Sequence, residues 1–186
     1  MISAEKQSLR LRMAETLRAL GEEARAEKSA RIAAHLKSLS GIVFGFAPMR
    51  LEPDWTDVIG AGWEVALPRA QAEGLAFHRV TDLSALAKGR LGAREPEGGE
   101  VIDVAAANVI LVPGVAFDRD GARLGRGGGY YDRLLVSAPA SARRVAVCFA
   151  CQLVDRVPAE PHDVEVDEIV TEDGWIEVRS SGRDRD

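Results

Sequence analysis

A glycine-rich segment at residues 121–133 holds the densest group of residues suited to chemistry. Five of its positions are glycines, namely Gly121, Gly125, Gly127, Gly128 and Gly129. Glycines let backbone N–H groups approach an anion closely, and a helix that starts near Tyr130 would add its positive N-terminal end. Arg123, Arg126 and Arg133 supply planar guanidinium groups that suit phosphate. The segment predicts a phosphate-binding loop, with a flexible surface turn that binds nothing as the alternative.

The elements that must position this loop are typical of an α/β fold. The run Val109–Val112 is apolar at every position, as expected of a central strand, and the loop follows its carboxyl end, where open α/β sheets bind ligands. Other short apolar runs alternate with segments able to form helices, at residues 54–59, 82–88 and 130–136. Because parallel strands need crossover connections, this alternation predicts a mainly parallel sheet covered on both faces.

The N-terminal part of the chain has a helical pattern. Leu9, Met13 and Leu17 recur at helical spacing, and Gly21 interrupts a pattern that continues to about residue 39. We expect a helical hairpin there. Together these elements predict an α/β protein with a three-layer α/β/α sandwich, in a single domain over residues 1–179. The polar segment 180–186 is expected to be a disordered tail.

Composition narrows the classes of partner. The chain has 186 residues, and 24 Lys and Arg against 29 Asp and Glu give a formal net charge of −5, which disfavours binding to nucleic acid or to an anionic membrane. No apolar run is long enough for a membrane helix, and the first residues lack the apolar centre of a signal peptide. Cys148 and Cys151 form a C-x-x-C pattern that we interpret as thiols of a reduced, cytoplasmic protein, not as a redox or zinc site.

Several motifs together resemble the 5-formyltetrahydrofolate cyclo-ligase family, also called methenyltetrahydrofolate synthetases. The most specific part is residues 113–133, which contains Pro-Gly-Val-Ala-Phe-Asp and Arg-Leu-Gly-Arg-Gly-Gly-Gly-Tyr-Tyr-Asp-Arg. Gln152, the pair Val157-Pro158 and the segment 163–171 extend the similarity. Weaker matches begin at Lys6 on the first predicted helix, so the resemblance spans nearly the whole chain.

The resemblance implies an enzyme that converts 5-formyltetrahydrofolate to 5,10-methenyltetrahydrofolate with ATP and Mg²⁺, releasing ADP and phosphate. A formyl group on N5 is an amide, and its oxygen is a poor leaving group. Transfer of the γ-phosphoryl group to that oxygen, followed by attack of N10, would close the ring. The protein would then mainly position the reactants and neutralise charge. We expect a monomer that binds these two small molecules.

The resemblance also implies roles for individual residues. ATP would be bound by Lys6, Arg10, Arg123, Leu124, Gly125, Arg126, Gly127, Gly128, Gly129, Tyr130 and Tyr131. The folate would be bound by Ala47, Glu52, Arg126, Gly127, Gly128, Gly129 and Tyr130, with Glu52 at the amino-pyrimidine edge of its ring. Arg126 and Tyr130 are the expected catalytic residues, and Asp132 and Asp163 the expected Mg²⁺ ligands.

Each of these residues has a simpler interpretation, and the chain departs from its relatives in places. Asp132 could merely favour the first turn of its helix, and Glu52 could be a solvated side chain. Some relatives carry Lys where this chain has Gly128, and Ala47 stands where a bulkier or hydroxylated residue is common. The alternatives are a regulator that binds nucleotide or folate without catalysis, and a sugar-phosphate-binding relative that uses the same loop.

Overall fold

The computed structural model describes residues 2–72, 74–90, 92–160 and 163–178. The tail expected at 180–186 and the domain end expected at 179 lie outside these residues. Within these ranges the α-helices are α1 (Ile2–Ala19), α2 (Glu22–Leu36) and α3 (Tyr130–Ser137). Single 3-10 turns in the same ranges are η1 (Thr56–Val58), η2 (Leu83–Ala85), η3 (Val104–Ala106) and η4 (Ala150–Gln152).

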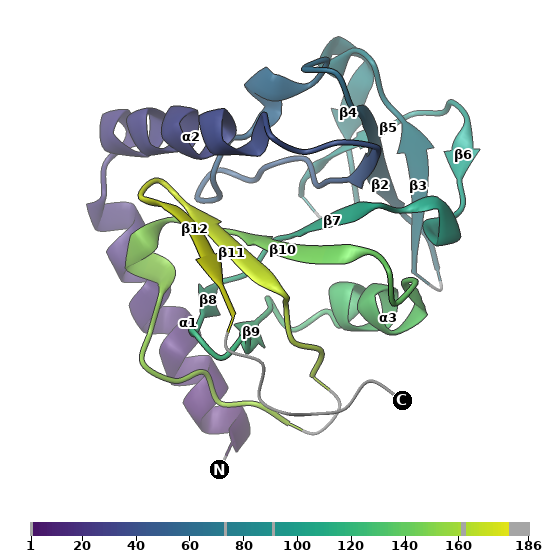
Figure 1. Ribbon diagram of the computed structural model, residues 1–186. Helices are drawn as coiled ribbons and strands as arrows, with labels where there is room; N and C mark the ends of the chain where they lie inside the picture. The colour runs from purple at the N-terminus through teal and green to yellow at the C-terminus, as the bar shows by residue number, and fades with distance from the viewer. Residues whose placement is uncertain (1, 73, 91, 161–162, 179–186) are drawn as a thin grey trace.

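The described residues form twelve strands, in one large sheet and two small hairpins. They are β1 (Ile42–Phe44), β2 (Glu64–Ala70), β3 (Leu75–Arg79), β4 (Leu86–Lys88), β5 (Arg94–Pro96), β6 (Val101–Ile102), β7 (Val109–Val112), β8 (Ala116–Phe117), β9 (Arg123–Leu124), β10 (Arg143–Val147), β11 (Glu168–Thr171) and β12 (Gly174–Glu177). The large sheet has the order β12-β11-β10-β7-β1-β2-β3-β6, while β4 pairs with β5 and β8 with β9 (Figure 1).

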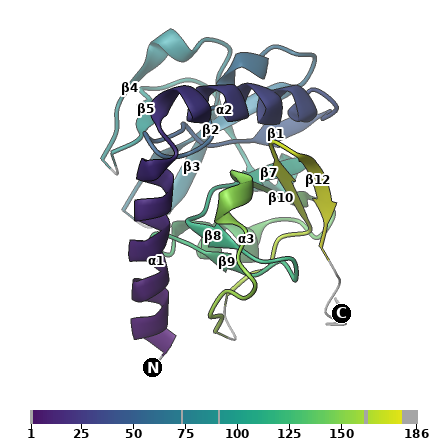
Figure 2. The same cartoon turned by 90° about the vertical axis from the view of Figure 1, so that its left-hand side faces the viewer.

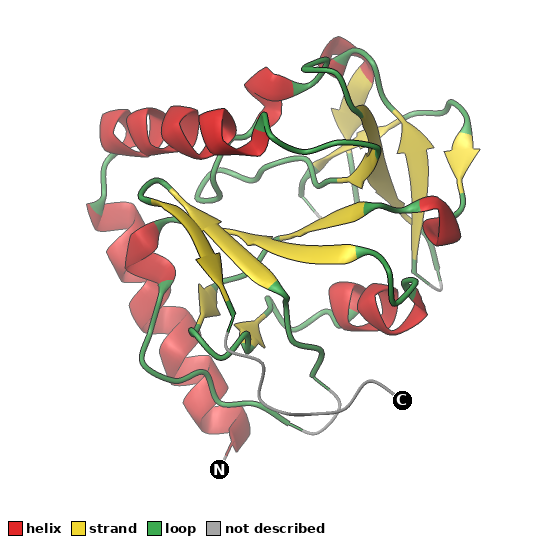
Figure 3. Cartoon of the chain, in the orientation of Figure 1, coloured by secondary structure: helices red, strands yellow, loops and turns green. Residues whose placement is uncertain are grey.

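The centre of the large sheet is parallel and its edges are antiparallel. Strands β2, β1, β7, β10 and β11 run parallel, and β3, β6 and β12 pair antiparallel outside them. All four residues of β7 are buried, because both faces of this strand are covered. Figure 3 shows the sheet between the N-terminal helices and α3.

Alternate side chains of the strands divide the core into two layers. On one face, Val43 and Leu111 pack in the same cluster as Leu9 and Ile32 of the N-terminal helices. On the other face, Phe44, Ile110 and Val112 pack with Leu134 and Leu135 of α3. The period of two along each strand therefore assigns residues to opposite helical layers, and the predicted α/β class with a mainly parallel sheet is confirmed.

The N-terminal helices follow the predicted pattern. The expected hairpin is present as two helices separated at Gly21, whose φ is +75°, with α2 lying across one end of α1 (Figure 2). Leu9, Met13 and Leu17 are buried on one side of α1. Within the part of the chain that the structure describes, no helix combines the length and apolarity needed to cross a membrane.

Two helices predicted from the sequence are wrong. Residues 54–59 and 82–88 form only the single turns η1 and η2, and residues 86–88 are strand β4. At Asp82 the carboxylate accepts the backbone N–H of Ser84, a local hydrogen bond that competes with a longer helix. Leu86 then pairs with Pro96 of β5 and is buried. Tertiary packing thus outweighs local helix propensity in this segment.

Candidate functional site

The order of the strands creates a crevice between β1 and β7. After β1 the chain builds β2 and β3 on one side of the sheet, and after β7 it builds β10 and β11 on the other side. Connections that leave adjacent parallel strands in opposite directions open a gap at the carboxyl ends of those strands. The segments that follow these ends are residues 45–55 and 113–129, which include the glycine-rich loop. The fold therefore places the predicted loop at the position where such sheets bind ligands.

A cavity of about 260 Å³ lies at this crevice. Its apolar side is formed by Phe46, Ala47, Met49, Pro68, Ala70 and Leu75. Its other side is formed by Pro113, Gly114, Arg123, Gly125, Arg126, Gly127, Gly128, Gly129, Tyr130, Tyr131 and Asp132. Glu52 and the β5 region, Ala93, Arg94 and Glu95, complete the lining. An apolar cavity with a few convergent polar groups is typical of a small-molecule site.

Glu52 and Arg126 join the two sides of the cavity. Arg126 donates from Nε and Nη2 to Glu52 Oε1, at 3.1 and 2.9 Å. The second oxygen, Oε2, accepts the backbone N–H of Met49 at 2.9 Å. The Glu52 side chain is only 8% exposed, whereas that of Arg126 is 53% exposed. The arginine can therefore move toward a ligand more easily than the carboxylate can.

The loop enters α3 through a glycine that the backbone requires. Gly129 is the N-cap of α3 and has φ +67°, a left-handed conformation that residues with a side chain rarely adopt. The following residues, Tyr130, Tyr131 and Asp132, form the first turn of α3 and line the cavity. The guanidinium of Arg133 lies over the Tyr130 ring, 5.0 Å from its centroid. This turn fixes the tyrosines at the wall of the cavity.

Arg123 is a buried cation beside the cavity. Its side chain is 4% exposed and forms an ion pair with Asp132, while Nη1 donates to the carbonyl of Pro113 at 3.4 Å. Its Nε and the Tyr131 hydroxyl are buried and have no hydrogen-bond partner among the described residues. Burial raises the pKa of Tyr131 far above its ordinary value, so the hydroxyl is neutral and able to donate.

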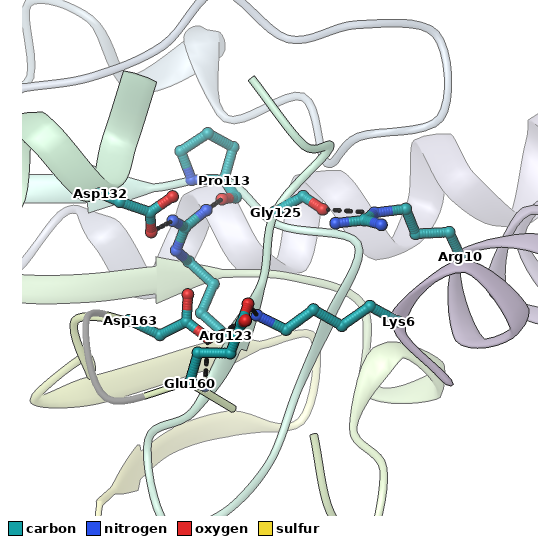
Figure 4. A network of polar contacts seen from close by, with 8 residues as sticks. All are labelled: Lys6, Arg10, Pro113, Arg123, Gly125, Asp132, Glu160 and Asp163. Carbon is teal, nitrogen blue, oxygen red and sulfur yellow. Dashed lines mark hydrogen bonds and ion pairs between the residues drawn. The ribbon is translucent and has the colours of Figure 1, made fainter. Parts of the chain in front are cut away.

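A second polar cluster connects α1 to the segment after η4. Lys6 donates to Glu160 at 2.8 Å and to Asp163 at 2.7 Å (Figure 4). Burial alone would lower the pKa of Lys6, but its hydrogen bonds to Asp163 and Glu160 outweigh burial, and the pKa is raised. One turn later, Arg10 donates from Nε to the carbonyl of Gly125 at 2.9 Å. The basic face of α1 thus reaches the glycine-rich loop.

Arg123 connects its own ion pair with Asp132 to the cluster of Lys6, Glu160 and Asp163. A second cavity of similar volume, about 260 Å³, is lined by Arg123, Glu160 and Asp163 among others, and Arg123 also lines the main cavity. Figure 4 shows Arg123 extending toward Asp132, with the Lys6 cluster close to its stem. Over the described ranges, no group of three or more His, Cys, Asp or Glu side chains could hold a metal ion.

Most predicted site residues line the main cavity, and four do not. Lys6 and Asp163 lie in the cluster at α1. The Arg10 side chain donates to a backbone carbonyl of the loop. Leu124 is buried in the core and is 1% exposed. The site residues that sequence reasoning missed include Met49, Ala70, Leu75, Ala93 and Arg94. These residues lie at or near strand ends, and that position identifies them as site residues only once the strand order is known.

Neither of the two cysteines lines the two cavities described above. Cys148 is buried and Cys151 is half-buried, and both are free thiols. Burial raises the pKa of each thiol above its ordinary value, and the charge of Glu172 adds to this effect. A thiol with a raised pKa is a poor nucleophile and a poor metal ligand at neutral pH.

Comparison with known proteins adds independent evidence. The 5-formyltetrahydrofolate cyclo-ligase of Mus musculus is 29% identical over 194 residues, which cover 92% of this chain and 96% of that protein. The enzyme of the same name from Mycolicibacterium smegmatis is 53% identical over 68 residues, 37% of this chain, and the match spans only 35% of that relative.

Structural similarity agrees with the sequence matches. The NMR structure of 5,10-methenyltetrahydrofolate synthetase from Aquifex aeolicus has 34% identity and a TM-score of 0.83, over 97% of this chain and 96% of that one. The family model described as the 5-formyltetrahydrofolate cyclo-ligase family matches residues 2–172. The chain therefore belongs to the 5-formyltetrahydrofolate cyclo-ligase family.

Proposed function

We propose that the protein converts 5-formyltetrahydrofolate to 5,10-methenyltetrahydrofolate in an ATP- and Mg²⁺-dependent reaction that releases ADP and phosphate. Family membership supports the reaction class. The observation that carries the proposal is the joining of an apolar cavity to a glycine- and arginine-rich loop at the carboxyl ends of β1 and β7. A reduced pterin needs apolar walls, and a phosphoryl group needs backbone N–H donors and cations.

The reaction requires activation of an amide oxygen. Transfer of the γ-phosphoryl group breaks its bond to the oxygen that bridges to the β-phosphate and forms a bond to the formyl oxygen. N10 then attacks the formyl carbon, the carbon–oxygen bond breaks, and phosphate leaves as N10 loses its proton. The negative charge that develops on the transferred group must be neutralised by positioned donors.

We assign this neutralisation to Arg126, with Tyr130 beside it. Arg126 is half-exposed, and among the described residues its guanidinium is held over the cavity by Glu52 alone, so it can turn toward the transferred group. The loop Arg123–Tyr131 would bind the ATP phosphates and, through residues 126–130, the folate; Ala47 and Glu52 line the cavity for the folate. Lys6 and Arg10 would bind ATP phosphates from α1, which for Lys6 requires exchange of its contacts with Glu160 and Asp163.

Asp132 and Asp163 are the residues that would hold Mg²⁺. Mg²⁺ uses one or two protein carboxylates and completes its coordination with water and phosphate oxygens, so it does not need a dense acidic cluster. Both carboxylates are half-buried and lie beside a cation, Arg123 or Lys6. Bound Mg²⁺ would neutralise phosphate charge. The chain's contribution is to keep two hard oxygen donors close to Arg123, one paired with it and one lining the same cavity.

The test follows the methenyl product by its near-ultraviolet absorption. Protein, 5-formyltetrahydrofolate, ATP and Mg²⁺ are mixed, and each component is omitted in turn. We expect absorption to rise only in the complete mixture, and Arg126→Ala to lower kcat about 10²- to 10³-fold, as expected when one donor to a developing charge is removed. Arg119→Ala, at an exposed arginine outside the main cavity, is the matched control and should keep full activity. Binding of ATP and folate without product would refute the enzymatic proposal.

A further inference from the structure

Glu160 is a carboxylate beside the glycine-rich loop to which the proposed function assigns no role. Its Oε2 accepts from Lys6 Nζ at 2.8 Å, and Asp163 Oδ2 accepts from the same nitrogen at 2.7 Å (Figure 4). The side chains of Lys6 and Asp163 are 11% and 15% exposed, whereas that of Glu160 is 41% exposed. Two carboxylates therefore share one buried ammonium, and Glu160 is the more exposed of the two.

The backbone and the side chain of Glu160 have different partners. The backbone N–H donates to Asp163 Oδ2 at 2.8 Å, so this oxygen accepts from both Glu160 and Lys6. The side chain of Glu160 contacts the Lys6 ammonium. A substitution of this side chain thus changes the contact with Lys6 and keeps the backbone hydrogen bond that orients Asp163.

Lys6 can leave the two carboxylates without a movement of α1. Arg10, one turn further along this helix, donates from Nε to the carbonyl of Gly125 and joins α1 to the glycine-rich loop. The ammonium of Lys6 is carried by a flexible stem with several rotatable bonds. It can therefore turn from the carboxylates to a phosphate group at the loop while Arg10 Nε keeps its contact.

The departure of Lys6 has a different cost with and without a metal ion. If Lys6 turned to the phosphates of free ATP, Glu160 and Asp163 would lose the cation that they share, and like charges at short distance repel. A divalent cation at Asp163, one of the residues proposed to hold Mg²⁺, would attract both carboxylates and replace the lost charge. Release of Lys6 is thus unfavourable with free ATP and is compensated when the metal ion binds as well.

We propose that Glu160 is a positioning residue that retains Lys6 until ATP binds together with Mg²⁺, an inference that rests on the proposed function. Through this contact the protein discriminates between free ATP and its metal complex, because only the complex brings the cation that replaces Lys6. Nucleotide and metal ion then strengthen each other's binding by the same factor, whichever binds first.

The test measures ATP binding by calorimetry with the full chain, once with MgCl₂ and once with EDTA. Glu160→Gln keeps the size of the side chain and removes its charge. In EDTA we expect this variant to bind ATP about threefold to tenfold more tightly than wild type, because Lys6 is released more easily. With Mg²⁺ we expect a change of less than about twofold, because the easier release of Lys6 is offset by the lost attraction between Glu160 and the metal ion.

Two further variants test whether Glu160 acts through Lys6. In a Lys6→Met background, Glu160→Gln should change ATP binding in EDTA by less than about twofold, since there is no ammonium to retain. Glu165→Gln removes another carboxylate that lines the same cavity, and as the matched control it should stay within about twofold of wild type. Where ATP binds too weakly for calorimetry, the rise in melting temperature on addition of ATP gives the same comparison.

The outcomes separate the role of Glu160 from the proposed function. Equal affinity of wild type and Glu160→Gln for ATP in EDTA would overturn the role of Glu160. So would an equal gain in the Lys6→Met background or in Glu165→Gln, because the effect would then come from charge alone. If wild type forms the methenyl product, such results leave the proposed function intact. If wild type binds no ATP even with Mg²⁺, the proposed function fails, and the role of Glu160 fails with it.

Discussion

Lys28 and Glu172 form an ion pair whose removal should destabilise the fold measurably. Lys28 of α2 donates to Glu172 Oε1 at 2.5 Å, and the backbone N–H of Ala150 donates to Oε2 at 2.8 Å. The Glu172 side chain is 2% exposed and that of Lys28 is 30% exposed. Replacing Lys28 by Met removes the side-chain donor and leaves a buried carboxylate whose remaining hydrogen bonds come from backbone N–H groups, that of Ala150 among them.

The expected loss follows from these burial values. Breaking a buried ion pair costs about 3–5 kcal/mol, and we take about 3 kcal/mol because water can reach the exposed part of the Lys28 side chain. For a chain of this size that loss lowers the melting temperature by roughly 6–12 °C. Combining Lys28→Met with Glu172→Gln removes the unpaired carboxylate charge and keeps an acceptor for the Ala150 N–H. The double variant should therefore lie within about 1 kcal/mol of wild type.

The pH dependence of this loss gives a second readout. Burial alone would raise the pKa of Glu172, but the hydrogen bonds from Lys28 and from the backbone of Ala150 outweigh burial and hold the pKa below its ordinary value. A carboxyl with a lowered pKa contributes stability that is complete above its unfolded pKa and is lost as the pH falls through its folded pKa. The difference between wild type and Lys28→Met should be largest near pH 7 and shrink on acidification. Equal melting temperatures at pH 7, or a difference unchanged at pH 4, would refute this reasoning.

Two further predictions concern the glycine-rich loop and the cysteines. Gly129→Ala places a side chain at φ +67° and should lower the free energy of unfolding by about 1–2 kcal/mol, seen as a lower melting temperature. The KM for ATP should also rise. An unchanged KM would mean that the turn into α3 does not shape the nucleotide site. Because burial raises the pKa of Cys148, this thiol should resist iodoacetamide in the folded protein at pH 7.5, while both cysteines react in denaturant. Mass spectrometry of the labelled protein measures the reaction at each cysteine. Rapid labelling of Cys148 in the folded protein would contradict the prediction.

The sequence alone predicts the parts of the site that are contiguous in the chain. The loop from Gly125 to Gly129 follows an all-apolar strand, and local chemistry is enough to identify both elements. The apolar half of the cavity could not be predicted, because Phe46 and Leu75 meet only through the order of β1, β2 and β3. The contact between Lys6 and Asp163 joins residues from opposite ends of the chain, and no local pattern encodes it.

The strand order also has a consequence for how the site comes into being. Val43 of β1 pairs with Val109 of β7, so the apolar wall, from residues 46–75, meets a loop that follows β7 and comes later in the sequence than β2 to β6. During synthesis, a chain that has emerged only as far as η3 carries Ala47 and Glu52 but neither β7 nor the glycine-rich loop. Ligand binding therefore requires β7 and the loop after it as well as the earlier strands. A ligand of this cavity would selectively stabilise molecules in which both walls are folded over molecules that are only partly folded.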